Sequence, residues 1–269
     1  MAARGKTCLV LGARGFIGSA VAAEAVARGY GVQAVDLDNY AGAVGAKPDL
    51  LVFAAGNSRK FIDDRDPLEG FRLSVEAMRR ALCDFHPDFF LLLSSGAVYP
   101  DEGDPARNAE DTRLDPARMT RYGFHKRLAE LLVLHECPRR LVLRMGGFVG
   151  AGLRKNAVRD VLSGGPLFVN PASAFQFMHT RDLARAAFTL YERAGAPPDV
   201  VNVSARGTAT VAEIAAWAGR ALPPETASLP TVHAELNLGL ASTLLDLPET
   251  APTVRAFVAD VLAGRVVLP

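Results

Sequence analysis

A tyrosine and a lysine four positions apart are the clearest candidates for acid–base chemistry in the chain. Tyr122 and Lys126 belong to the segment Tyr-Gly-Phe-His-Lys, and a helix there would put both on one face. A free phenol has a pKa of about 10 and is a poor base at neutral pH. A nearby ammonium group favours the phenolate and lowers that pKa. The pair predicts a site that removes or supplies a hydroxyl proton, although the same spacing is also common in surface pairs without such a role.

A serine after a predicted buried strand supplies a third polar group. Ser95 follows the apolar segment 89–94, and open α/β sheets bind ligands at the carboxyl ends of their strands. We expect its hydroxyl to donate a hydrogen bond to a substrate oxygen and to orient that oxygen. Tyr122, Lys126 and Ser95 are therefore the predicted catalytic residues.

Near the N-terminus, three glycines form the pattern G-x-x-G-x-x-G between a predicted strand and a predicted helix. The first glycine permits a tight turn, the second lets the backbone approach a pyrophosphate, and the third lets helix and strand pack closely. This context favours dinucleotide binding over an ordinary turn. The predicted cofactor contacts here are Gly12, Arg14, Gly15, Phe16, Ile17 and Gly18.

An aspartate ends the second predicted strand. Asp36 lies 18 residues after Gly18, near the ~20 expected for the acid that binds the adenosine ribose. Its carboxylate would repel a 2′-phosphate, which favours NAD over NADP, and Leu37 is a further predicted contact. Arg14 argues the other way, because it could contact that phosphate, so NADP stays open. A strand-end turn at Asp36 with a solvated Arg14 is the alternative without function.

Short apolar segments alternate with longer amphipathic ones, which predicts an α/β fold with a Rossmann-like, doubly wound parallel sheet. The predicted strands are Thr7–Leu11, Gly31–Asp36, Leu50–Ala54, Phe89–Ser94 and Arg140–Arg144. The predicted helices are Phe16–Arg28, Pro67–Phe85 and Pro116–Cys137. The stretch between Asp36 and Leu50 is too short for a full helical crossover, so we expect a loop or a stub of strand there.

After residue 145 the sequence becomes rich in glycine and proline. We predict a dinucleotide-binding domain over residues 1–145, its sheet completed by parts of 176–205, and a smaller substrate-facing lobe over 146–269. Within the later part we expect a helix at 180–193, a strand at 200–203, a helix at 211–220, and near the end a short turn at 244–248 and a helix at 254–262.

Composition excludes several classes of protein. The chain has 269 residues, 49% of them hydrophobic and 22% charged, and a net charge of +1. It can bury a full core, and its charge does not favour nucleic acid or an anionic membrane as partner. There is no signal-peptide pattern, and the three cysteines suit reduced, mostly buried packing residues, so we expect a cytoplasmic protein. The histidines lack metal-ligand spacing; we predict no metal and an exposed His125.

Taken together, these segments resemble the extended short-chain dehydrogenase/reductases, or NAD-dependent epimerases/dehydratases, over residues 6–205. The resemblance rests on the glycine turn, Asp36, the strand 51–56, the segment 93–99, the Tyr122 and Lys126 pair, and the junction 177–184. It implies that Tyr122 is the general acid/base, that Lys126 also binds the nicotinamide ribose, and that a homodimer forms through the helices 67–85 and 116–137. It further implies cofactor contacts at Ala54, Ala55 and Gly56. Candidate substrate contacts are Asn57, Lys60, Ser74, Ser95, Gly147 and Gln176.

Departures from the family pattern bear on the reaction. Dehydratases of this family carry an Asp-Glu pair after the hydroxyl residue, and this chain has Gly96 and Ala97 there. The asparagine and arginine that hold a nucleotide diphosphate are replaced by Gly147 and Phe175. Arg144 could supply a substitute cation, but a solvated surface charge is the preferred interpretation.

We therefore expect hydride transfer at a secondary alcohol or ketone of a sugar or sugar-like small molecule. This prediction covers both an epimerase and an oxidoreductase, because both need the same three residues. A simple reductase of a small non-nucleotide carbonyl compound is the alternative. A non-catalytic NAD(P)-sensing protein is the alternative from another class, since a sensor needs only the glycine turn.

Overall fold

Six strands form the main sheet in this computed structural model, which describes residues 5–193 and 197–269. Their order across the sheet is β2 (Gly31–Val35), β1 (Thr7–Leu11), β3 (Leu50–Phe53), β4 (Phe90–Leu93), β5 (Arg140–Met145) and β9 (Val200–Val203). Strands β1 to β5 run parallel, and every residue of β3 and β4 is buried. Burial of both faces explains why these strands are continuous apolar runs. The predicted α/β fold is confirmed.

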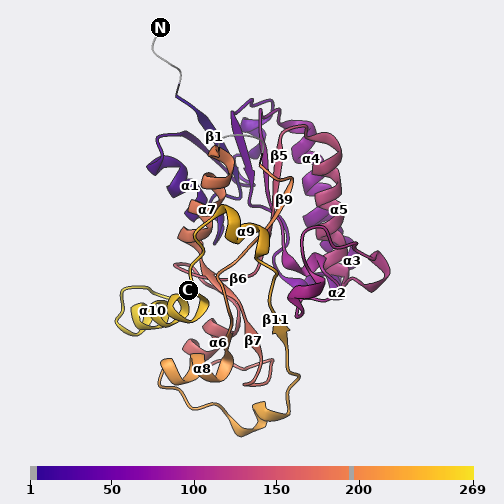
Figure 1. The fold of residues 1–269 in the computed structure, drawn as a ribbon. Coiled ribbons are helices and arrows are strands. Elements are labelled where there is room, and N and C mark those ends of the chain that lie inside the picture. The colour runs from indigo at the N-terminus through magenta and orange to yellow at the C-terminus, as the bar shows by residue number, and fades with distance from the viewer. Residues whose placement is uncertain (1–4, 194–196) are drawn as a thin grey trace. The chain divides into compact units, whose positions relative to one another are not determined.

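Helices cover both faces of this sheet (Figure 1). On one face lie α1 (Gly18–Ala27) and α7 (Thr180–Glu192), and on the other lie α4 (Ala77–Asp84) and α5 (Arg121–Glu136). Between the sheet and α4 and α5, buried side chains form one apolar cluster, which includes Leu9, Leu51, Phe90, Met78 and Val133. This packing fixes α5, which carries the Tyr122 and Lys126 pair, against the strands.

Short helical segments make up most of the connections in the first two thirds of the chain. They are the 3-10 helices η1 (Tyr40–Ala43), η3 (Gly96–Val98), η4 (Pro105–Arg107) and η5 (Pro116–Arg118), the α-helices α2 (Lys60–Arg65) and α3 (Pro67–Phe71), and the π-helix η2 (Arg72–Glu76). The predicted abbreviation after the second strand is confirmed, because η1 is the only helical turn between β2 and β3 among these described residues.

The later part of the chain contains small sheets and short helices. Its strands are β6 (Gly147–Val149), β7 (Ala174–Phe175), β8 (Phe177–His179), β10 (Ala209–Thr210) and β11 (His233–Ala234). Its helices are α6 (Ala157–Ser163), α8 (Val211–Trp217), η6 (Pro224–Ser228), α9 (Gly239–Leu244) and α10 (Thr250–Leu262). The sequence did not indicate α6 or α9, and the last helix begins four residues earlier than predicted.

Two predicted helices are interrupted. The helix expected from Pro116 begins only at Arg121, because Met119 is extended and the Thr120 side chain caps α5 by accepting a hydrogen bond from the Gly123 amide at 3.1 Å. The helix expected over 67–85 runs through α3, the π-helix η2 and α4. A single π-turn inside a helical run widens it by one residue per turn and is common at functional sites.

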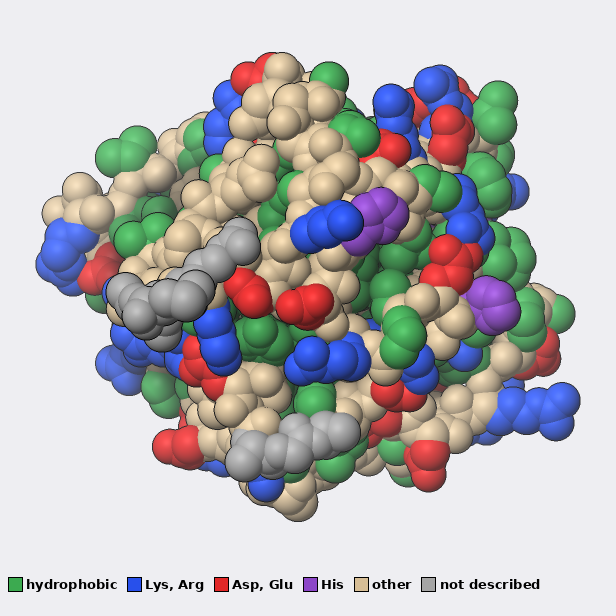
Figure 2. All heavy atoms as spheres, turned by 90° about the horizontal axis from the view of Figure 1, so that it is seen from above, with side chains coloured by type: hydrophobic (Ala, Val, Ile, Leu, Met, Phe, Trp, Pro, Cys, Tyr) green, Lys and Arg blue, Asp and Glu red, His purple; other side chains and the backbone are tan. Residues whose placement is uncertain are grey.

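The chain divides into two compact units. The first consists of residues 1–100, 111–145 and 184–201, and the second of residues 101–110, 146–183 and 202–269. Within the described ranges no helix is long and apolar enough to span a membrane. On the face drawn in Figure 2, positive and negative side chains are interspersed with hydrophobic ones, as the small net charge leads one to expect. The cysteines are free; Cys8 is buried, but Cys83 is exposed, contrary to expectation.

Candidate active site

The glycine turn has the geometry that close backbone approach requires. Gly12 has a φ of +80°, and a Cβ added there would lie 3.0 Å from backbone atoms of Ala54 and Ala55. A Cβ at Gly18 would overlap the carbonyl oxygen of Gly12. Both positions therefore exclude any larger residue, and the turn leads directly into the start of α1. The start of a helix that follows such a turn is a suitable cradle for a pyrophosphate.

The carboxylate predicted to bind a ribose is engaged by the arginine of the glycine turn. Asp36 Oδ2 accepts hydrogen bonds from the Arg14 amide at 3.1 Å and from Arg14 Nε at 3.0 Å. The other end of the guanidinium pairs with Asp38. Hydrogen bonds to Asp38 and Asp36 raise the pKa of Arg14. The bond between Arg14 and Asp38 in turn lowers the pKa of Asp38. Leu37, between the two aspartates, is 98% exposed.

Tyr122 and Lys126 lie together, as the sequence predicts. Tyr122 is buried in the first turn of α5, and Lys126 Nζ lies 5.7 Å from the centre of its ring. Lys126 Nζ also lies close to Gly56, where an added Cβ would be 3.8 Å away. The loop after β3 and the Tyr122 helix are thus in contact within the first unit.

Ser95 lies on a turn that packs directly against α5. Its Oγ accepts a hydrogen bond from the Ala97 amide at 3.2 Å and so caps η3. A Cβ at Gly123 would overlap the carbonyl oxygen of Ala97, so only glycine at that position allows α5 to approach η3 this closely. The structure therefore brings the segment of Ser95 next to the helix turn that carries Tyr122. Gly123, which no earlier argument singled out, is a positioning residue of this contact.

A buried ionic network joins the ends of β4 and β5 to α5. Glu130 has no exposed surface; it pairs with Arg144 at 2.9 Å and accepts a hydrogen bond from Ser94 Oγ at 2.6 Å. Arg144 also donates to the Tyr99 hydroxyl at 2.8 Å. Burial alone would lower the pKa of Arg144, but the Glu130 carboxylate outweighs this effect and the pKa is raised. The interpretation of Arg144 as a solvated charge is wrong; it is buried, and the network holds the residue before Ser95 against α5.

His125 is not exposed, which corrects another expectation. Its ring is buried, and its Nδ1 lies 2.6 Å from Oδ1 of Asp63 on α2. Asp63 also accepts a hydrogen bond from Asn57 Nδ2. This pair was not predictable from the sequence, because the two residues are 62 positions apart and Asp63 belongs to no recognised motif.

The candidate substrate residues fall into both units. In the first unit, Lys60 Nζ lies 5.9 Å from the centre of the Tyr122 ring, and Asn57 is occupied by its bonds to Asp63 and Arg59. Ser74 lies in the π-helix, and its buried Oγ has no hydrogen-bond partner among the residues that the structure describes. Such a buried hydroxyl is costly unless a ligand or water completes it.

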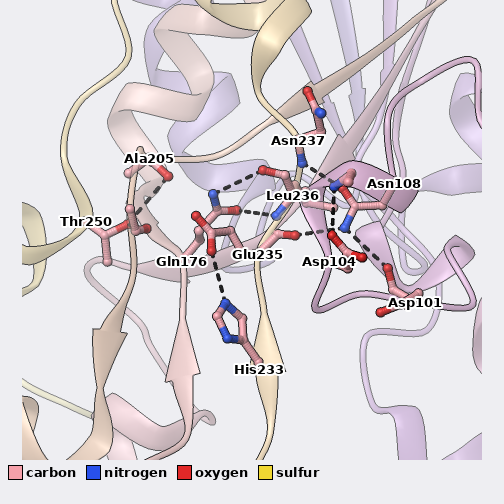
Figure 3. Close-up of polar contacts among 12 residues, drawn as sticks. Asp101, Asp104, Asn108, Gln176, Ala205, His233, Glu235, Leu236, Asn237 and Thr250 are labelled. Carbon is pink, nitrogen blue, oxygen red and sulfur yellow. Dashed lines mark hydrogen bonds and ion pairs between the residues drawn. The ribbon is translucent and has the colours of Figure 1, made fainter.

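In the second unit, the side chain of Gln176 is buried and bonded at both ends of its amide. Its Oε1 accepts from the Leu236 amide at 2.9 Å and its Nε2 donates to the Leu236 carbonyl at 3.3 Å (Figure 3). Gly147 donates its amide to the Gln176 carbonyl at 3.1 Å. These bonds give Gln176 a structural role in this conformation.

Asn108 ties the segment 101–110 to the segment 233–237 in the same unit. It is fully buried, donates to the Glu235 carbonyl at 2.8 Å and accepts from the Asn237 amide at 2.7 Å (Figure 3). Among the described residues no group of three or more His, Cys, Asp or Glu side chains is arranged to hold a metal ion.

Comparison with known proteins points to one family of sequences and to one fold. The sequence profile of the NAD dependent epimerase/dehydratase family matches residues 8–204. A search of curated protein sequences gives no match. Among solved structures, a UDP-galactose 4-epimerase is similar with a TM-score of 0.74 at 21% identity, covering 96% of this chain and 99% of the other.

Two further structures carry out other reactions on the same fold. An NAD dependent NDP-hexosamine 5,6-dehydratase, TunA, has a TM-score of 0.75 at 17% identity, with 96% of this chain and 98% of the other covered. A dTDP-4-dehydrorhamnose reductase from Bacillus anthracis, in complex with NADP, has a TM-score of 0.73 at 13% identity, with 97% and 100% covered. At these identities the likeness concerns the fold, which serves an epimerase, a dehydratase and a reductase alike.

Proposed function

Because the chain belongs to the NAD dependent epimerase/dehydratase family, we propose that it is an NAD-dependent enzyme. It transfers hydride at a secondary alcohol or ketone carbon of a sugar or sugar-like substrate. The observation that carries this proposal is the close packing of Gly123, next to Tyr122 on α5, against Ala97 in the turn of Ser95. Lys126 lies beside the Tyr122 ring, and the same unit holds the glycine turn.

The residues present fit a dinucleotide. The backbone of the glycine turn offers a cradle that a Cβ at Gly12 or Gly18 would fill. When bound, the nicotinamide supplies or accepts the hydride, and the protein orients the reacting carbon. Gly56 and Lys126 would flank the ribose on the nicotinamide side. The backbone of Ala54 and Ala55 would lie below the adenosine.

The three side chains then divide the proton chemistry among them. Tyr122 removes the hydroxyl proton during oxidation and returns a proton during reduction. Lys126 favours its phenolate and binds the ribose hydroxyls. Ser95 donates a hydrogen bond to the substrate oxygen, where negative charge develops.

We assign NAD in preference to NADP. Asp36 and Asp38 both lie at the end of β2, where a 2′-phosphate would have to sit, and both would repel it. Arg14 is already paired with these two carboxylates. The family itself uses either cofactor, so a direct comparison of NAD and NADP binding tests this assignment.

Within the family, epimerisation or plain oxidoreduction fits the site better than dehydration. Gly96 and Ala97 occupy the two positions after Ser95 and are buried in the contact with α5, so an acid–base pair for dehydration is missing there. The family resemblance puts Phe175 at the position of a phosphate-binding arginine, and the centre of its ring lies 6.0 Å from that of Phe177. This apolar contact favours a second candidate, a reductase of a small non-nucleotide carbonyl compound.

A cytoplasmic location and a homodimer also belong to the proposal.

Native mass spectrometry of the purified protein, followed by assays of Tyr122→Phe, tests the function. We expect retained NAD and turnover of a sugar nucleotide or of a non-nucleotide carbonyl compound. Tyr122→Phe should lose roughly 10²–10⁴-fold in kcat with NAD still bound. Tyr191→Phe, on α7, is the matched control and should keep full activity. If the wild-type protein binds NAD but turns over no carbonyl or alcohol substrate, and Tyr122→Phe leaves NAD binding unchanged, the protein would instead be a sensor.

A further inference from the structure

Asp63 is a carboxylate with no exposed surface, and it lies on the short helix α2 rather than in the protein's predicted motifs. It bonds to the His125 ring at 2.6 Å and to the Asn57 amide nitrogen. Burying a carboxylate costs free energy unless it is paired and hydrogen-bonded, and apolar residues in its place would often be as stable. A buried His–Asp pair is therefore a poor way to gain stability alone, which prompts the question of what it positions.

The pair joins α2 to the beginning of α5. Arg121, the first residue of α5, donates from Nη1 to the Asp63 carbonyl at 3.0 Å. The Phe71 ring of α3 packs edge-on against the His125 ring at 5.6 Å, and Gly70 allows α3 to lie directly on Asp63. Bonds to Asp63 thus fix the position of α2 from the α5 side and from the loop after β3.

The consequence of this anchoring is visible at the other end of α2. Lys60 is its first residue, and its Nζ lies 5.9 Å from the centre of the Tyr122 ring. Lys126 Nζ lies at almost the same distance, 5.7 Å. Tyr122 is therefore approached by one ammonium group from its own helix and by a second from α2.

We propose that Lys60 is a second cation of the tyrosine site and that Asp63 and His125 are positioning residues that hold it there. Only the reaction that Tyr122 performs rests on the proposed function; the effect of Lys60 on the Tyr122 phenol does not. The charged groups involved are Lys60 and Asp63 from α2 and Arg121, His125 and Lys126 from α5. Two ammonium groups favour the phenolate more than one does, because each adds its own attraction.

Ultraviolet titration of tyrosinate in the cofactor-free protein tests the proposal without any substrate. Each spectrum is taken as a difference from the same protein carrying Tyr122→Phe. Burial, aided for Tyr30 by Glu192 and for Tyr40 by Asp84, raises the pKa of both phenols, and burial likewise raises the pKa of Tyr191. The difference spectrum removes the signals of these tyrosines and leaves that of Tyr122.

We expect Lys60→Met to move the Tyr122 midpoint upward by roughly half to one pH unit at low salt, and less at high salt because Lys60 is exposed. Lys60→Arg keeps a cation at this position and should retain most of the wild-type midpoint. Arg65→Met, which removes a cation from the other end of the same helix, is the matched control and should leave the midpoint unchanged.

The positioning role is tested at His125. His125→Ala should reproduce the upward shift, whereas His125→Asn, whose amide can donate to Asp63 from nearly the same place as Nδ1, should retain most of the wild-type midpoint. If His125→Ala fails to fold, Lys60→Met decides the matter alone. An unchanged midpoint in Lys60→Met overturns the proposal, even if activity falls. A shifted midpoint in a protein without enzymatic activity would uphold it and refute the proposed function instead.

Discussion

Glu130 concentrates several interactions in one buried carboxylate. Its oxygens bond to Arg144, Arg127 and Ser94, and none of its surface is exposed. Removing the charge would leave the buried Arg144 guanidinium without its counter-ion. Such a loss is more costly than the loss of a surface ion pair, where solvent takes the place of the partner.

Glu130→Gln should lower the free energy of unfolding by about 3–5 kcal/mol, the range observed when a buried ion pair is broken. Urea unfolding measures this difference. Glu136 also lies on α5, and Glu136→Gln breaks a more exposed pair with Arg79 of α4. This variant should cost less than about 1 kcal/mol. Equal losses for the two variants would contradict the assignment of a buried charge network.

The Cys8 thiol makes stability depend on pH above neutrality. Burial raises its pKa to about 12 from an ordinary value near 9. A raised pKa in the folded state stabilises the protein fully below pH 9, and this contribution is lost as the pH rises towards 12, at about 1.4 kcal/mol per pH unit. The free energy of unfolding, measured with urea between pH 8 and about 11, should therefore depend less on pH in Cys8→Val than in the wild type. Cys83→Val, at the exposed cysteine, should leave the dependence unchanged.

The position of helix α5 depends on one glycine, Gly123, which lets the helix approach η3 closely. The Ala97 carbonyl oxygen occupies the space that a side chain at Gly123 would need. Alanine is normally preferred over glycine inside a helix by about 1 kcal/mol. The close contact reverses this preference, so the position of α5 relative to Ser95 is set by steric fit rather than by helix propensity.

Gly123→Ala should displace the first turn of α5, lower the free energy of unfolding by about 1–3 kcal/mol, and reduce kcat while NAD binding persists. Thermal unfolding and steady-state kinetics measure the two effects. Gly42→Ala, in a 3-10 helix with open space around the added methyl group, should be neutral in both. A stabilised and fully active Gly123→Ala would show that the contact does not position the helix.

The elements around the site differ in how far they can be predicted from sequence. Strands β1, β3 and β4 are continuous apolar runs, so their positions and the turn at Gly12 follow from local pattern alone. Tyr122, Lys126 and Ser95 are recognisable for the same reason. The burial of His125 is not, because it depends on Asp63, 62 residues away, on a helix of six residues. Arg144 likewise looks like a surface charge until Glu130 is placed beside it.

On the scale of the whole molecule, the chain passes between the two units several times. Residues 101–110 belong to the second unit although residues on both sides belong to the first, and residues 184–201 belong to the first although they follow a long segment of the second. Asn108 shows why this passage of the chain between the units cannot be predicted from the sequence. Its partners, Glu235 and Asn237, are more than 100 residues away, and asparagine in a loop usually indicates only a turn.

The assembly of the whole molecule gives a further prediction. The family resemblance implies a homodimer through the helical segments 67–85 and 116–137, and these carry exposed leucines, including Leu131 on α5. Leu131→Asp should convert the dimer to a monomer in sedimentation velocity at micromolar protein, because a charge would be buried without a partner. Val267→Asp, at an exposed valine outside these helices, should leave the sedimentation coefficient unchanged. A monomeric wild type would refute the implied assembly.

The steric closure around Gly12 has a thermodynamic consequence for the molecule. The Gly12 amide already donates to Val35 at 2.8 Å and the Gly15 amide to Gly12 at 3.0 Å, so the backbone of the turn is held before any nucleotide arrives. A receptor that is rigid beforehand loses little freedom on association, and more of the contact energy is then available as affinity. The entropic penalty of capture should accordingly fall on the flexible dinucleotide, which must give up its own rotations to enter.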